Sequence, residues 1–200
     1  RRSYTLYDPP DLVGLVSPEL GPYVADVIDE HDAIYADNTL PDAVSRMCLA
    51  DSRLFLPGLN LAYTDRASMA ASIEVRVPFV DPTVAAAAFS TPGPTKIRGR
   101  TSKAALKDAA AAWLPQEIIH RPKASFSAPL RAWISRDLKD TVDQELLGGE
   151  LVASGFLRRE PLEQLILDER NGRQDNSKQI WQLLTTEMWC RQARSSGVTV

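Results

Sequence analysis

The sequence predicts a mainly α-helical chain, for three reasons. Apolar residues recur at helical spacing, most clearly in the run Ile180, Leu183, Leu184 and Met188. Prolines stand at the boundaries of most such segments, where helices tolerate them best. Strand signals are confined to residues 6–7 and 75–77. The chain has 200 residues, of which 44% are hydrophobic, so it can bury a core as one domain or a large piece of one.

Caps and breaks place six helices in the first part of the chain. Ser17 and Pro18 supply an N-cap and a first-turn proline for the first of them. The pair Pro57-Gly58 is expected to stop the second helix or to turn it. Asp81 is the expected cap of an alanine-rich helix. The predicted ranges are about 18–36, 41–56, 59–72, 82–89, 102–113 and 115–120.

Three more helices are predicted in the remainder of the chain. Pro129 opens the first, which ends at the Gly148-Gly149 break. Pro161 starts the second, and the segment NGRQDNS ends it. The last helix covers about 177–194, and two tryptophans widen its apolar face. Three large apolar side chains, those of Met69, Phe79 and Trp133, are expected in the core.

Charge and cysteine content narrow the class of protein. The net charge is −3 and the pI is about 5.5, which argues against a general nucleic-acid binder. Cys48 and Cys190 stand in apolar surroundings, as packed, reduced thiols of a cytoplasmic protein do. Neither a secretory leader nor a long apolar run is found, so we expect a soluble protein without a membrane partner. The chain opens on RRSYTLYDPPD, without methionine, which indicates a fragment.

Several familiar motifs are absent from the sequence. It has no G-x-x-x-x-G-K-[ST] loop, no G-x-G-x-x-G turn and no G-x-S-x-G elbow. His31 and His120 have no cysteine pairs near them, so a zinc site is not predicted. Each histidine is interpreted as structural, and no metal-binding residue is proposed.

Two stretches carry a more specific signal. The first is LPGLNLAYTDRASMAASIEVRVPFVD, residues 56–81, and the second is RPKASFSAP, residues 121–129. Together they resemble the synthetase domain of the asparagine synthetase family, in which L-P-x-x-N-L leads to D-R-x-S-M-A, then to E-x-R-x-P-F-x-D and later to R-x-K. Residues 181–184 (WQLL) are similar to that family's closing W-x-L-L. The resemblance runs from about residue 40 onward and is weaker over residues 1–40.

The resemblance implies a place in a larger fold. Residues 1–200 would form a partial domain, the helical C-terminal portion of an α/β adenine-nucleotide α-hydrolase-like synthetase domain. The family's S-G-G-x-D-S nucleotide loop and its glutaminase domain are absent from this chain. We therefore expect the chain alone to be inactive, with exposed apolar surface where the missing sheet belongs.

The resemblance also implies a reaction. In the family, a substrate carboxylate attacks the α-phosphate of ATP, pyrophosphate leaves with Mg²⁺, and a nitrogen nucleophile displaces AMP to form an amide. The first hypothesis pairs aspartate as the acid with glutamine-derived ammonia. The second is an internal amine that closes a β-lactam or a macrolactam, as in β-lactam synthetases and lasso-peptide cyclases. The third is a helical scaffold without activity, and for any of them the aromatic last helix could contact another copy as a homodimer.

The second stretch would supply the main catalytic charge. Lys123 matches the family's catalytic lysine, which reaches the phosphates and the reacting centre. Pro122 and an anchored Phe126 would restrict the loop and keep the compact ammonium near its target. Arg121 pairs either with a local carboxylate or with the phosphates.

The first stretch would supply the remaining site residues. Glu74 is either a general base or the partner that orients Arg76. Asp65 and Arg66 are adjacent, so on a helix they point in different directions; they either contact the substrate or hold their helix against the domain body. Leu59 stands where many relatives carry an acid, which removes a charge near the site.

Overall fold

The computed structural model describes residues 6–122 and 129–197. Over these residues the chain is helical, and its two isolated bridges belong to no strand. The prediction of a mainly α chain is confirmed. The strand signals at residues 6–7 and 75–77 are wrong, because no extended segment of the described residues pairs with either, and an unpaired strand leaves its backbone groups unbonded.

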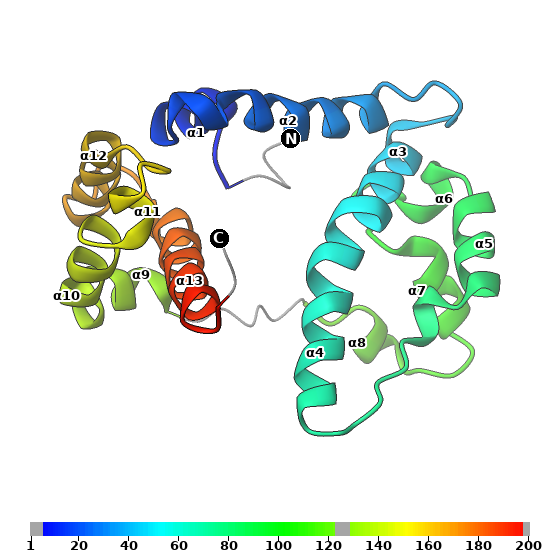
Figure 1. Cartoon of the computed structure of the whole chain (residues 1–200). Coiled ribbons are helices and arrows are strands. Elements are labelled where there is room, and N and C mark those ends of the chain that lie inside the picture. The colour runs from blue at the N-terminus through cyan, green and yellow to red at the C-terminus, as the bar shows by residue number, and fades with distance from the viewer. Residues whose placement is uncertain (1–5, 123–128, 198–200) are drawn as a thin grey trace. The chain divides into compact units, whose positions relative to one another are not determined.

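The chain divides into two compact units (Figure 1). The terminal unit combines residues 1–28 with residues 125–200, and the central unit comprises residues 29–124. In the terminal unit the elements are α1 (Pro9–Leu15), η1 (Pro18–Leu20), α9 (Leu130–Ala132), η4 (Trp133–Asp137), α10 (Lys139–Val142), η5 (Asp143–Leu147), α11 (Glu150–Ala153), α12 (Arg159–Arg170) and α13 (Ser177–Ser195). The unit boundary falls within α2 (Gly21–Tyr35). In the central unit they are α3 (Ala43–Ala50), η2 (Asp51–Leu61), α4 (Ala62–Ala70), η3 (Pro78–Val80), α5 (Pro82–Ser90), α6 (Gly93–Lys96), α7 (Ala104–Ala110) and α8 (Gln116–Ile119).

The helix α13 lies at the centre of the terminal unit, and α9, α11, α12 and η5 pack against it. Its predicted apolar run is buried at Ile180 and Leu184, whereas Met188 is 51% exposed. Cys190 is also buried there, and both cysteines are free thiols. None of the helices in the described part of the chain is long and apolar enough to cross a membrane. The rest of this core comes from Leu15, Ile134, Val142, Leu146, Leu162 and Ile166.

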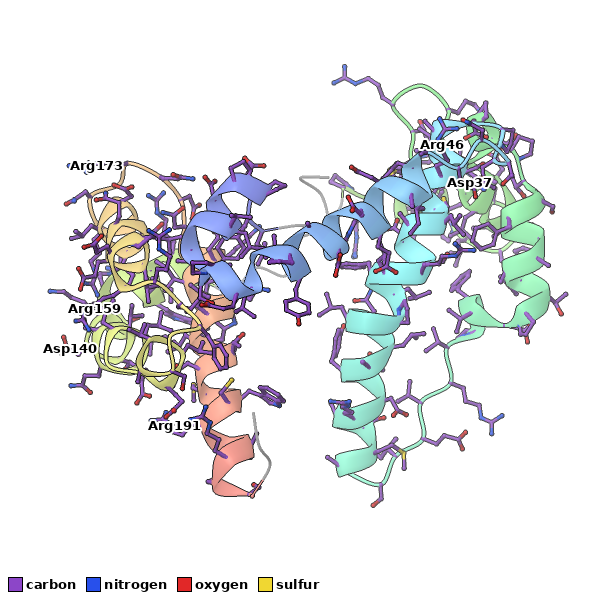
Figure 2. The ribbon with its side chains drawn as sticks, turned by 45° about the horizontal axis from the view of Figure 1, so that its top comes forward. Asp37, Arg46, Asp140, Arg159, Arg173 and Arg191 are labelled. Atoms are coloured by element: carbon purple, nitrogen blue, oxygen red, sulfur yellow. The ribbon has the colours of Figure 1, made fainter. Side chains whose placement is uncertain are left out.

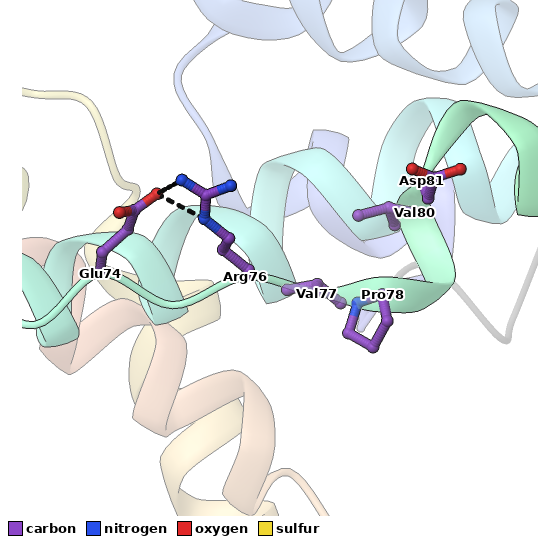
Figure 3. Close-up of a pocket in the computed structure, with 6 residues that line it drawn as sticks. All are labelled: Glu74, Arg76, Val77, Pro78, Val80 and Asp81. Atoms are coloured by element: carbon purple, nitrogen blue, oxygen red, sulfur yellow. Dashed lines mark hydrogen bonds and ion pairs between the residues drawn. The ribbon is translucent and has the colours of Figure 1, made fainter.

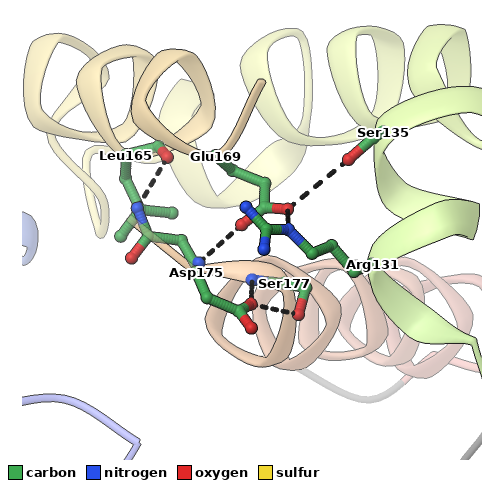
Figure 4. A network of polar contacts seen from close by, with 7 residues as sticks. Arg131, Ser135, Leu165, Glu169, Asp175 and Ser177 are labelled. Carbon is green, nitrogen blue, oxygen red and sulfur yellow. Dashed lines mark hydrogen bonds and ion pairs between the residues drawn. The ribbon is translucent and has the colours of Figure 1, made fainter. Parts of the chain in front are cut away.

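A buried carboxylate joins three helices of the terminal unit (Figure 4). The side chain of Glu169, at the end of α12, is fully buried. Its Oε1 accepts hydrogen bonds from Arg131 Nε at 3.1 Å and from Ser135 Oγ at 3.4 Å, and its Oε2 accepts from the backbone N–H of Asn176 at 2.7 Å. A buried charge is tolerated only with such partners, so this group fixes α9 and the start of α13 against α12.

A second buried carboxylate caps a short helix. Glu187, on α13, accepts hydrogen bonds from the backbone N–H groups of Glu150 and Leu151 at 2.7 and 2.8 Å. These are first-turn donors of α11 that have no partner within the helix. The close approach depends on Gly149, because a Cβ added there would lie 2.6 Å from Glu187 Cδ.

In the central unit, α3, η2 and α4 follow one another without a break from residue 43 to residue 70. The prediction that Pro57-Gly58 stops or turns the helix is therefore wrong. Pro57 lies inside η2, an 11-residue stretch of π-helix. Proline has no N–H for the α-helical hydrogen bond, and the chain passes it in wider π turns instead of ending.

Two aspartates organise the start of this long helix. Asp42 caps α3 by accepting from Ser45 N and Ser45 Oγ, both at 2.9 Å, and it also accepts from Gly93 N of α6 at 3.1 Å. The hydrogen bond from Ser45 N is the main reason that the pKa of Asp42 is lowered. Figure 2 labels Asp37 in the preceding loop and Arg46 on α3. Hydrogen bonds from Thr39 lower the pKa of Asp37, with a smaller contribution from Arg46.

The expected core positions of three large apolar side chains are not observed. Met69, Phe79 and Trp133 are 54%, 65% and 38% exposed. Poor helix formation does not explain this exposure, because Met69 and Trp133 both lie in helices. Met69 and Phe79 belong to the central unit, whose buried residues are few and mostly small, so its described helices cover little of each other's apolar surface. Trp133 belongs to η4 of the terminal unit, where the neighbouring Ile134 is the buried residue.

Candidate functional site

The motif residues 65–81 begin on α4 and continue into a turn. The helix ends in a Schellman motif, in which Ile73 N donates to Ser68 O and Ser72 N donates to Met69 O, both at 2.9 Å. Ser72 has φ +57°, the left-handed conformation that this cap requires and that glycine usually supplies. The reversal carries the chain from α4 directly to Glu74.

Glu74 and Arg76 form an ion pair in the segment after α4 (Figure 3). Arg76 donates from Nε and from a terminal guanidinium nitrogen to the same oxygen, Glu74 Oε1, each at 2.9 Å. The side chains are 85% exposed for Arg76 and 69% exposed for Glu74. Water screens such a pair, so it stabilises the fold little. The ion pair orients the guanidinium of Arg76, and both of its contacts use Glu74 Oε1, so Glu74 Oε2 takes no part in the pair.

These two residues line an open hollow of about 760 Å³. The other lining residues follow Arg76 in the chain, and among them Pro78 starts the single turn η3. Asp81 also lines the hollow and at the same time caps α5, accepting from Thr83 N at 2.8 Å. Figure 3 shows Glu74 and Arg76 at one end of this segment and Asp81 at the other. The hollow thus combines one cation and two carboxylates with the apolar side chains of Val77 and Val80.

The other site residues predicted from the sequence are not brought into this hollow. Asp65 and Arg66 lie on α4 with exposed side chains, and no ion pair joins either to another described residue. Arg121 follows α8, is exposed and likewise has no carboxylate partner among the described residues. Lys123 lies outside the described residues. The roles of all four remain predictions.

Asp81 is the residue that the sequence-based choice of site residues missed. The sequence predicts Asp81 as a helix cap and as the last residue of the E-x-R-x-P-F-x-D match, and its side chain does cap α5. The signal that could have added it is the spacing E-x-R-x-P-F-x-D, which places a third charged residue seven positions after Glu74. That spacing places Asp81 just after the single turn η3, on the same hollow as Glu74 and Arg76.

The described residues fit a phosphate group only in part, and they do not fit a magnesium ion. No group of three or more histidine, cysteine or acidic side chains that could hold a metal occurs in residues 6–122 and 129–197. Mg²⁺ prefers carboxylate and phosphate oxygens in octahedral geometry, which this hollow does not assemble. Guanidinium groups can bind phosphate oxygens, and Arg76 lines the hollow with its guanidinium held by Glu74.

The comparisons with known proteins agree on one family. A family model described as "Asparagine synthase" matches residues 11–191. A "Putative asparagine synthetase [glutamine-hydrolyzing]" of Mycobacterium tuberculosis H37Rv is 36% identical over 162 residues, covering 78% of this chain and 24% of that protein. "Asparagine synthetase [glutamine-hydrolyzing] 1" of Bacillus subtilis 168 is 29% identical over 146 residues, covering 73% of this chain and 23% of that protein. No solved structure matches.

The match covers the site. It begins at residue 11 and includes all six residues carried over from the motifs. The chain spans about a quarter of the length of the curated relatives that it matches. Since the family model covers most of the chain, this chain belongs to the asparagine synthase family.

Proposed function

We propose that this chain is part of an ATP-dependent amide-forming ligase that adenylates a carboxylate, most simply aspartate, and transfers ammonia to it. The observation that carries the proposal is the family match over residues 11–191, which contains both motif stretches. The relatives named as glutamine-hydrolyzing asparagine synthetases support ammonia as the nucleophile. A homodimer and a cytoplasmic location, in keeping with two free thiols, belong to the same proposal.

Within this reaction, the chain's own residues bind and orient. Attack on a phosphate concentrates negative charge on its oxygens, so preorganised cations supply much of the rate. Arg76 is held by Glu74 at 2.9 Å and would contact an anionic substrate group at the hollow. Glu74 is then a positioning residue for Arg76 more than a base. We assign the phosphate-contacting charge to Lys123, supported by Arg121, on the R-x-K match alone.

ATP would supply the activating AMP group, with Mg²⁺ neutralising its phosphates. The described residues lack a magnesium site, so we derive no step through the metal from them. The remaining parts of the nucleotide site are expected outside this chain, which alone should not turn over ATP.

The test is pyrophosphate release from ATP by the protein in which this chain occurs. It should be measured with aspartate, glutamate and larger carboxylates, each with and without glutamine or ammonium. Release that depends on one acid, with an amide product that depends on ammonia, supports the proposal. Pyrophosphate release with a cyclic product and no need for ammonia would assign the internal-amine reaction instead. If no acid supports pyrophosphate release, the remaining hypothesis is a helical scaffold without activity.

A further inference from the structure

Acidic and basic residues are segregated along this chain. Residues 3–45 contain nine acidic residues and neither lysine nor arginine. Residues 96–107, by contrast, contain five lysine or arginine residues and no acid. Because the net charge of the whole chain is only −3, its composition does not require such a separation. Nothing in the proposed reaction uses either group of charges.

The basic residues lie on a tight turn and on the helix that follows it. Two backbone hydrogen bonds of 3.0 Å close the turn over residues 98–101, and Arg100 is exposed at its tip. Lys103 caps the start of α7, and Lys107 lies four residues further on, a spacing that puts both on one side of the helix. We call Arg100, Lys103 and Lys107 the basic face.

The central unit neutralises little of this positive charge. Asp108 pairs with Arg98 at 2.6 Å, but no ion pair joins the basic face to any residue that the structure describes. Lys96 Nζ is buried and has no hydrogen-bond partner among those residues. Lys103 has φ +55°, a left-handed conformation for which glycine is usual, and yet a cation occupies the position. The segment therefore keeps a surplus of positive charge.

The exposed acids of α2 form a complementary face. Asp26, Asp29 and Glu30 stand at positions i, i+3 and i+4, so they lie on one side of the helix. All three residues are exposed, and no ion pair joins them to another residue in the described part of the chain. Like charges at this spacing repel one another and destabilise a helix. A cation placed against these three residues, which we call the acidic face, would relieve that repulsion.

Each face also exposes a large apolar side chain. Leu106 precedes Lys107 on α7 and is 46% exposed. Tyr23, three residues before Asp26 on α2, is 67% exposed. Exposed ion pairs contribute little by themselves, so apolar surface that leaves water when two faces meet would add to the affinity.

We propose that the basic face of one copy of this chain binds the acidic face of a second copy. Asp29 and Glu30 belong to the central unit, as the basic face does, and no ion pair joins these two residues to that face within one copy. In a closed dimer the contact would form twice, because each copy offers both faces. A nucleic acid would meet the basic face alone, and the net charge of −3 disfavours it.

This inference rests on the homodimer of the proposed function, to which it gives a surface, and it needs no step of the proposed reaction. The contact also differs from the aromatic last helix that the sequence suggests for a second copy. On α13 that helix exposes Trp189, at 60%, but the described residues show no symmetric or charged complement to it. The opposite charges of the two faces favour them as the contact.

The test is sedimentation velocity of the full chain over a range of concentrations. It should be run in about 0.1 M and about 1 M NaCl, between which the Debye length falls from about 10 Å to about 3 Å. The basic-face variant is Arg100→Glu with Lys103→Glu, and the acidic-face variant is Asp29→Lys with Glu30→Lys. Circular dichroism should confirm that each folds as the parent does, and Arg100→Glu alone replaces the basic-face variant if that is unstable.

We expect self-association in 0.1 M salt that weakens at least about tenfold in 1 M salt and in either double variant, as for a contact between exposed charges. Mixing the two variants should restore association, because every face of one then meets a face of opposite charge on the other. The control is Lys139→Glu with Lys178→Glu, the same change of charge in the terminal unit, which should associate as the parent does.

Three results would overturn the proposal. The first is a monomer at every concentration in 0.1 M salt, and the second is two variants that remain apart when mixed. The third is association that both charge variants retain and that Trp189→Ala removes, which would assign the contact to α13. None of these results affects pyrophosphate release, so failure of this proposal and failure of the proposed reaction can be distinguished.

Discussion

The carboxylate of Glu74 has two possible roles, to orient Arg76 or to act as a general base, and a substitution can distinguish them. If Glu74 orients Arg76, Glu74→Gln keeps an oxygen that accepts from the guanidinium, and kcat should stay within about tenfold of the parent. If Glu74 is a general base, glutamine cannot take the proton and kcat should fall about 10²- to 10⁴-fold. We predict the first result, because both donor nitrogens of Arg76 meet Glu74 Oε1 at 2.9 Å.

The measurement is steady-state amide formation by the protein that contains this chain. Glu74→Ala should reduce activity more than Glu74→Gln, because it leaves Arg76 without an orienting partner. The matched control is Glu117→Gln, a carboxylate in the first turn of α8 that is outside the hollow. A large kcat loss in Glu74→Gln, with Glu117→Gln unaffected, would make Glu74 the base.

Asp42 makes the stability of the central unit depend on pH. Hydrogen bonds from Ser45 and Gly93 lower its pKa in the folded chain. A carboxyl with a lowered folded pKa contributes its full stabilisation above the ordinary aspartate pKa of about 3.9 and loses it as pH falls through the folded value. We therefore expect Asp42→Ala to lower the free energy of unfolding at pH 7 and to lose less stability than the parent on acidification.

This difference can be measured by urea unfolding of both proteins from pH 7 down to pH 2, below the lowered folded pKa of Asp42. The two curves should converge at acid pH, since the parent's carboxylate is then protonated. Asp140→Ala is the control, an exposed aspartate in the terminal unit. A constant gap between parent and Asp42→Ala across the range would show that the cap acts without its charge.

At the scale of the element, the left-handed position of the cap after α4 is occupied by a serine, where glycine is usual. Ser72 has φ +57°, where a side chain other than that of glycine costs about 1–2 kcal/mol. Ser72→Gly should therefore raise the free energy of unfolding by about 0.5–1 kcal/mol, after the greater freedom of glycine in the unfolded chain is subtracted.

Thermal and urea unfolding of Ser72→Gly and Ser68→Gly provide a test of sign. Ser68 lies within α4, where glycine should lower stability by about 0.5–1 kcal/mol. The same substitution four residues apart is thus expected to have opposite effects. Destabilisation by both would mean that the left-handed cap is not formed in solution.

The sequence predicted most helices because periodicity and caps are local properties. Asp81 caps α5 as expected, and α13 starts at Ser177, where its predicted range begins. Local signals failed at Pro57, since a proline indicates a break but does not reveal that π turns can carry the helix past it. They also missed α1, whose signal was the proline pair at its first two positions.

The candidate site was predictable to a similar extent. Motif spacing identified Glu74 and Arg76, which do lie together, because a single residue separates them in an irregular segment. It did not predict that Asp65 and Arg66 would stand outside the hollow, since their position depends on how α4 ends at Ser72. Contacts of Arg121 depend on partners that no local pattern specifies.

At the scale of the whole molecule, the two units differ in how much they bury. The terminal unit has a continuous core around α13 and two buried carboxylates with partners. The central unit leaves large side chains such as Phe79 and Trp113 exposed, at 65% and 80%. Surface of this kind usually marks an interaction site. We expect the synthetase segments that this family has, and that this chain lacks, to cover it.

The most direct test of the central claim is pyrophosphate release from ATP by the protein that contains this chain, with Lys123→Ala compared against Lys178→Ala. Lys178 is an exposed lysine on α13, and its replacement should leave turnover unchanged. We predict a loss of about 10²-fold or more for Lys123→Ala, the size expected when one preorganised charge is removed from a phosphoryl-type transition state. Equal turnover in the two variants would contradict the assignment of Lys123 to the phosphates and, with it, the site proposed for this chain.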